Sequence, residues 1–206
     1  MKKCIVLIVL GAVTILTVFG QEKPDALAMY YEGRYEDAIQ VCLDELKELP
    51  RNMDSYAVMC WSLIELKKYQ DSFDQVSKAL AMAPYDPRIV EVAGESLYFL
   101  GKNREALKYF EQYIFISRSG LRISRVYYYM GEIFIRLGEY NNADIAFSTA
   151  LHFDEQIADW WSRLGYAREM GEQYEWAVEA YENALRLNPN LDQAKNGLAS
   201  VKKKME

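Results

Sequence analysis

The sequence predicts an all-α fold, an α-solenoid of about four to five stacked helix-turn-helix repeats with a capping helix at the C-terminal end. Three series of residues predict it, because each keeps a period of 34 residues that lengthens once to 37. A fixed period of this size is typical of repeats that stack side by side. The first series consists of small residues: Ala38, Ser72, Ala106, Ala143 and Ala177. The second consists of glycines: Gly94, Gly131 and Gly165. The third is aromatic, with Asn103 as its exception: Tyr35, Tyr69, Tyr140 and Tyr174.

The start of the chain, residues 1–20, forms a segment of its own. Two lysines precede an uncharged run at 4–19, and Gly20 is small enough to stand just before a cleavage point. This order is typical of a secretory signal peptide, here cut before Gln21. The run is short for a membrane span, but a retained N-terminal anchor stays open as the alternative. We therefore expect an exported protein of the periplasm or cell envelope, which meets a membrane only through this segment if it is retained.

The remaining residues, 21–206, divide into repeats of two amphipathic helices each. In chain order the repeats are expected at about 22–52, 53–86, 87–120, 124–157 and 158–191, followed by the capping helix at 192–206. Prolines close three repeats, because proline cannot continue a helix. These prolines are Pro50, Pro84 and Pro189. The first repeat fits the pattern mainly in its second helix, and the second and third fit it less fully than the last two.

Smaller features justify the turns and the cap. Gly138 and Gly171 are expected at the turn between two helices, where glycine ends a helix at little steric cost. The single excess of three residues lies around 119–121, a turn-like place where an insertion is tolerated. In the capping helix one apolar stripe faces the last repeat and lysines form the outer side. We read Lys202, Lys203 and Lys204 as a solvated helix end and not as a nucleic-acid or lipid site.

The last two repeats carry a recognisable motif. The fourth contains Tyr127, Met130, Gly131, Phe134, Gly138, Tyr140, Ala143, Phe147 and Ala150. The fifth contains Trp161, Leu164, Gly165, Tyr174, Ala177, Tyr181, Ala184 and Pro189. Both sets resemble the tetratricopeptide repeat, and the resemblance extends over nearly all of residues 21–206. It implies a concave surface, lined by the first helix of each repeat, on which a protein or peptide partner binds.

The family's binding positions, transferred residue by residue, predict a groove. Its residues are Trp61, Ile64, Glu91, Glu95, Tyr98, Phe99, Tyr128, Glu132, Ile135 and Tyr166. Family members that grip a C-terminal carboxylate use lysines and asparagines at these positions, so we do not expect such capture here. We expect an aromatic surface with acids beside it, which suits an apolar or amphipathic segment. The alternative for each aromatic residue is a place in the core.

Four arginines surround the irregular junction between the third and fourth repeats. They are Arg118, Arg122, Arg125 and Arg136. They could receive an acidic partner segment. We favour local pairing with Glu132, Glu139 or Asp144.

Other functions find little support in the residues. The only histidine, His152, stands near a helix end, and no metal-ligand spacing, phosphate loop or nucleophile elbow is present, so we expect no enzyme, cofactor or metal. A net charge of -6 argues against nucleic-acid binding. Cys42 and Cys60 are read as core residues, with a disulfide as the alternative. Two other functions stay open: a self-associating structural subunit of an envelope complex, and a ligand-binding or transport-accessory module.

Overall fold

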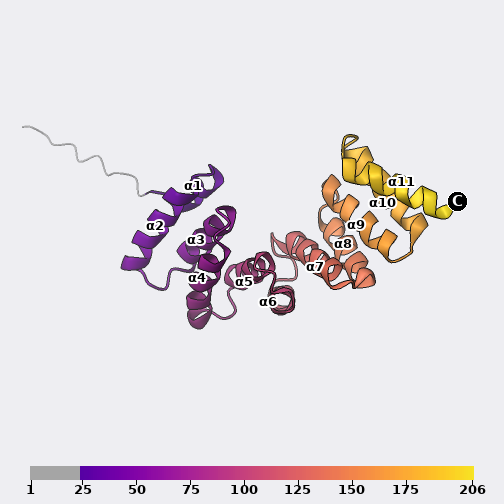
Figure 1. Cartoon of the computed structure of the whole chain (residues 1–206). Coiled ribbons are helices and arrows are strands. Elements are labelled where there is room, and N and C mark those ends of the chain that lie inside the picture. The colour runs from indigo at the N-terminus through magenta and orange to yellow at the C-terminus, as the bar shows by residue number, and fades with distance from the viewer. Residues whose placement is uncertain (1–23) are drawn as a thin grey trace, which may run out of the picture.

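The structure, a computed structural model, describes residues 24–206, so the expected signal peptide or anchor at 1–20 lies outside the described residues. The described residues form eleven α-helices and no β-strand, which confirms the predicted all-α class (Figure 1). The helices are α1 Ala26–Tyr31, α2 Tyr35–Glu48, α3 Met53–Glu65, α4 Tyr69–Met82, α5 Pro87–Phe99, α6 Asn103–Ile116, α7 Ile123–Leu137, α8 Tyr140–Phe153, α9 Ala158–Met170, α10 Tyr174–Leu187 and α11 Asp192–Met205.

The helices stack in chain order into an arch (Figure 1). Each helix packs against the next one along the chain, and α11 covers both α9 and α10. Each odd-numbered helix also packs on the next odd-numbered helix, whereas within the described residues no even-numbered helix packs on the next even-numbered one. Helices on the inside of a curve approach one another more closely than those on the outside. The concave face is therefore lined by α1, α3, α5, α7 and α9.

Side-chain caps fix the starts of the first three inner helices. Asp25 accepts hydrogen bonds from the backbone N–H groups that begin α1, and Asn52 does the same for α3. Asp86 caps α5, and Pro87 follows at the first helical position, where its missing N–H has no partner to lose. Helix α1 spans only six residues, against 13 for α3 and α5.

The turn inside each helix pair uses one backbone conformation. Five residues at the same repeat position have a positive φ: Gly33, Lys67, Gly101, Gly138 and Glu172. Glycine adopts this left-handed conformation without steric cost, whereas lysine and glutamate do not. Gly138 and Gly171 both end their helices as expected, but Gly171 does so with a φ of -85°, and the left-handed residue of that turn is its neighbour Glu172.

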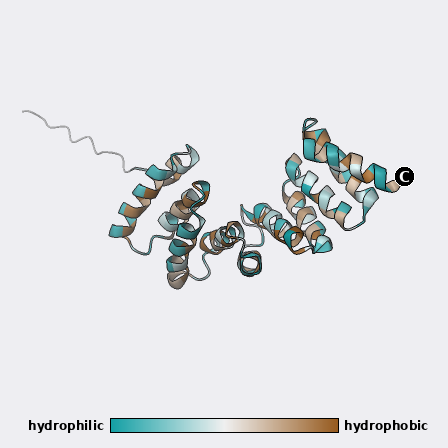
Figure 2. Ribbon diagram, in the orientation of Figure 1, coloured by the Kyte–Doolittle hydropathy of each residue, from teal (hydrophilic) through white to brown (hydrophobic). Residues whose placement is uncertain are grey.

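The repeating small residues form the interior between the paired helices. All five members of the small series are fully buried. Each glycine of the second series lies against an aromatic ring of the following helix, and a Cβ added there would come within 2.7 Å of that ring. The three pairs are Gly94 with Phe110, Gly131 with Phe147, and Gly165 with Tyr181. Figure 2 shows the resulting pattern, in which hydrophobic and hydrophilic residues alternate around the helices. The period seen in the sequence is thus a period of helix contacts.

The third and fourth helix pairs are joined by an irregular segment, residues 117–122, between α6 and α7. Leu121 in this segment is fully exposed, and Gly120 lies so close to the Tyr113 hydroxyl that a side chain there would force a shift. This is where the sequence carries its three additional residues, so the insertion is accommodated at a seam between pairs and not within a helix.

Two further findings concern the cysteines and the membrane. Cys42 in α2 and Cys60 in α3 are buried and unbonded, and burial raises the pKa of each thiol to about 12. They are core residues in this structure. Within residues 24–206, no helix combines the length and the apolar character that a membrane crossing needs.

Candidate partner-binding groove

The groove is the concave face of α1, α3, α5, α7 and α9. Two of its hollows lie beside large aromatic side chains. One, of about 620 Å³, lies at the N-terminal end, where Leu27, Val58 and Trp61 form apolar walls and Asp54 and Arg88 form a polar edge.

The second hollow, of about 460 Å³, opens at the start of α7. Arg122 and Arg125 lie on one side of it, and Tyr128 and Trp160 on the other. Both hollows thus combine a large aromatic side chain with an arginine.

Trp61 is the main aromatic residue of the N-terminal hollow. It is partly exposed, and its ring lies 6.0 Å from that of Tyr30 and 5.1 Å from the guanidinium of Arg122. Among the described residues its indole N–H has no hydrogen-bond acceptor. The nitrogen itself is buried, so the exposed part of the side chain that a partner can contact is the apolar surface of the ring.

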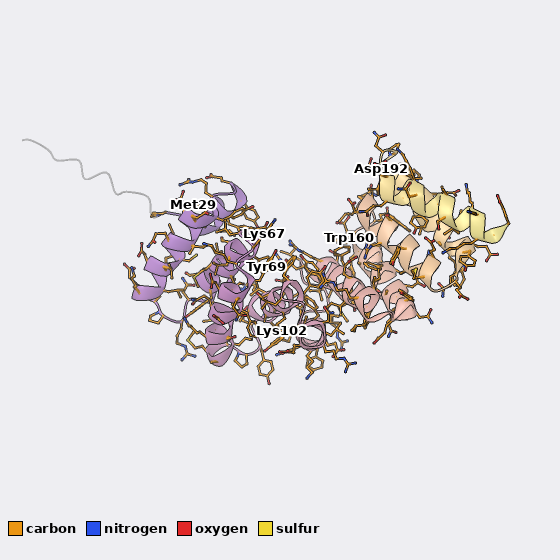
Figure 3. All side chains as sticks on the ribbon, in the orientation of Figure 1. Met29, Lys67, Tyr69, Lys102, Trp160 and Asp192 are labelled. Carbon is orange, nitrogen blue, oxygen red and sulfur yellow. The ribbon has the colours of Figure 1, made fainter. Side chains whose placement is uncertain are left out.

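Tyr128 forms the wall of the second hollow together with Trp160. Their rings stack 5.0 Å apart at 14°, and both side chains are partly exposed. Figure 3 shows Trp160 on the inner side of the arch, facing the opening between its two arms. Trp160 is not among the ten predicted groove residues. The available signal was the pair Trp160–Trp161, in which the repeat motif accounts for only the second tryptophan.

Four of the ten predicted groove residues are buried and do not form its surface. Ile64 and Tyr98 are packed in the core at 5% and 7% exposure. Glu91 and Glu95 are at 0% and 1% and lie beneath the groove. Two of the acids expected beside the aromatic surface are therefore covered by other side chains, because Arg122, just before α7, and Arg125, in α7, reach across them.

The two carboxylates belong to a buried cluster between α5 and α7. Glu95 accepts hydrogen bonds from Arg122 and Arg125, each at 2.8 Å, and from the Tyr129 hydroxyl at 2.7 Å. Glu91 has fewer partners than Glu95. Its Oε1 lies 2.9 Å from Arg122 Nε, and neither of its oxygens has a well-directed hydrogen bond within the described residues. Burial and the neighbouring Glu95 carboxylate raise the pKa of Glu91 to about 7, against the attraction of the arginines.

The arginines pair differently from the expectation. Arg122 and Arg125 pair with Glu91 and Glu95, not with acids of their own repeat. Arg136 has its guanidinium 4.1 Å from the centre of the Tyr98 ring and donates to the Tyr98 carbonyl oxygen.

The acids that were expected to pair with these arginines have other partners. Glu132 accepts a hydrogen bond from Arg163 at 2.9 Å, and Asp144 accepts one from Arg168 at the same distance. Because the partners come from the next helix pair, each arginine ties two repeats together. Arg118 is exposed.

The remaining predicted residues keep some exposed surface. Phe99 is the most exposed of them and stacks on Tyr69, with ring centres 4.7 Å apart. Ile135 and Tyr166 are partly exposed, and the guanidinium of Arg163 lies over the Tyr166 ring. The groove surface is therefore aromatic, and the arginines on it are largely neutralised from below.

Comparisons with known proteins point to one kind of repeat. Models of the tetratricopeptide repeat match residues 124–156 and 158–191, the fourth and fifth helix pairs. MamA from Desulfovibrio magneticus RS-1 is 17% identical, with a TM-score of 0.69 over 81% of this chain and 93% of that chain. YrrB, described as a TPR protein with an unusual peptide-binding site, is 18% identical, with a TM-score of 0.66 over 83% of this chain and 87% of that chain. The Cut9–Hcn1 structure is 15% identical, with a TM-score of 0.77 over 85% of this chain and 35% of that chain. No curated protein sequence matches the chain.

Proposed function

We propose that this tetratricopeptide-repeat solenoid is a non-catalytic scaffold, exported to the cell envelope, whose concave groove binds an apolar or amphipathic segment of a partner protein. The observation that carries the proposal is the arrangement of partly exposed aromatic residues around two hollows on one continuous face. Large rigid aromatic residues in such hollows are typical anchors of protein interfaces. Tetratricopeptide repeats are in general interaction modules, and YrrB, which has the same fold, is described as having a peptide-binding site.

The charge of the groove narrows the kind of partner segment that we expect. The buried acids are balanced by Arg122 and Arg125, and Glu132 is balanced by Arg163. A partner therefore gains little from a strong charge of either sign. Its apolar side chains would contact Trp61, Tyr128 and Trp160.

The proposal is tested by copurification from the cell envelope. The groove variant carries Trp61→Ala and Tyr128→Ala, and we leave out Tyr98 because it is buried. The matched control carries Phe115→Ala and Trp176→Ala, two aromatic residues on even-numbered helices with 79% and 57% exposure. Circular dichroism first establishes that both variants are folded. A partner that is lost with the groove variant and kept with the control supports the proposal; retention by both contradicts it.

Export rests on the sequence of residues 1–20 alone and has its own test. A reporter enzyme that is active only outside the cytoplasm is fused after residue 206. Activity that disappears when residues 4–19 receive two charged substitutions supports export. An inactive fusion to the native sequence, despite full expression, would place the scaffold in the cytoplasm.

A further inference from the structure

The buried cluster between α5 and α7 has an uneven distribution of partners. Glu95 receives both arginines and the Tyr129 hydroxyl, while Glu91, which is equally buried, has a single close contact with Arg122 Nε. A buried carboxylate without directed hydrogen bonds is unfavourable in its charged form. One proton on Glu91 removes that cost.

The charged and titratable groups that act on Glu91 come from α5, α6, α7 and the segment before α7. Glu95 lies one turn away on α5, Arg122 at the end of the connecting segment contacts Glu91, Arg125 on α7 lies near it, and Tyr113 approaches from α6. Two carboxylates and two guanidiniums balance when both acids are charged. Burial and the proximity of Glu95 nevertheless raise the pKa of Glu91 to about 7, so its charge changes near neutral pH.

The cluster lies at the seam between two halves of the arch. Residues 117–122 connect α6 to α7 without regular structure, and Leu121 in this segment is fully exposed. The hollow lined by Arg122, Arg125 and Tyr128 opens beside the seam, so water is close to the cluster. A small separation of α5 and α7 would let water reach Glu91 without breaking either helix.

We propose that this seam is a proton-operated joint: protonated Glu91 favours the closed seam that the structure shows, and ionised Glu91 favours an open seam in which water reaches its carboxylate. The direction follows from linkage, since the state that holds the proton more tightly is favoured as the pH falls. Because Arg122 also contacts the Trp61 ring, opening the seam moves a wall of the groove, and the curvature of the arch becomes dependent on pH.

Small-angle scattering tests the joint without any partner. The purified protein is measured at about pH 5.5 and about pH 8.5, together with Glu91→Gln, which carries no charge at either pH. We expect the native protein to have a larger radius of gyration at the higher pH and Glu91→Gln to keep the smaller value at both. Equal radii for the native protein, or equal expansion of Glu91→Gln, would overturn the proposal.

Two controls assign the effect to Glu91. Glu132→Gln removes a carboxylate from a different arginine pair, and His152→Gln removes the only histidine of the sequence. Both must expand like the native protein; a control that stays compact refutes the assignment. If Glu91→Gln does not fold, amide hydrogen exchange of the native protein decides. After correction for intrinsic rates, protection at 117–126 must be lower at the higher pH, and unchanged protection refutes the joint.

Discussion

At the scale of single residues, the repeat is fixed by contacts that leave no room for a side chain. Gly94, Gly131 and Gly165 each face an aromatic ring of the following helix, and each is buried. The sequence revealed these glycines because they keep the period. It could not reveal that Glu91 and Glu95 are buried, because acids one turn apart on a helix most often face solvent. The arginines that cover them stand about 30 residues later, beyond the irregular junction.

Gly131→Ala tests the glycine–aromatic contact. The new methyl group would meet the Phe147 ring, and both helices would have to move apart, so we expect a loss of about 1–3 kcal/mol in the free energy of unfolding. Urea denaturation followed by circular dichroism measures it. Gly171→Ala is the milder comparison, because its added Cβ would lie 3.3 Å from the Ala167 carbonyl oxygen, against 2.7 Å from the Phe147 ring at position 131, and its φ is negative. Similar midpoints for Gly131→Ala and the native protein would show that the two helices are not in firm contact.

At the scale of helices, the sequence predicted the turn inside a pair but not which of its residues takes the left-handed conformation. Gly171 ends α9 as expected of a glycine, with a negative φ. The positive φ falls on Glu172, which aligns with Gly138 in the preceding pair. The position within the repeat therefore determines which residue has the positive φ, whether or not that residue is glycine. The same comparison explains Lys67, whose φ of 59° is unusual for a lysine.

Lys67→Gly tests whether the left-handed turn is strained. Glycine relieves the steric cost of a positive φ but loses more backbone freedom on folding, so we expect a net gain of about 0.5–1 kcal/mol in stability. Thermal unfolding of the native protein and the variant measures the difference. Lys67→Ala keeps the Cβ and should leave stability nearly unchanged. An alanine variant as stable as the glycine variant would mean that the lysine side chain, and not its backbone, is responsible.

At the scale of the whole molecule, periodicity predicts the stacking but not the surface. The all-α solenoid follows from the fixed period, because no repeat can bury its apolar face alone. The residues on the groove surface are predicted less completely. Trp61, Phe99 and Tyr128 keep exposed surface, but Trp160, which completes the second hollow, came only from the structure. Its contact with Tyr128 depends on how far consecutive pairs rotate against each other, and that rotation is decided by packing across each seam.

The central claim is that a protein partner contacts the concave face, and site-specific photo-crosslinking tests it most directly. A photoreactive amino acid replaces Trp160 on the groove or, as the control, Trp176 on α10, where 57% of the side chain is exposed. Both proteins are produced and irradiated in the cell of origin. If the partner binds in the groove, we expect a covalent adduct with another protein from position 160 and none from position 176. An adduct from position 176 alone, or from neither position while the native protein still copurifies with its partner, would contradict binding in the groove.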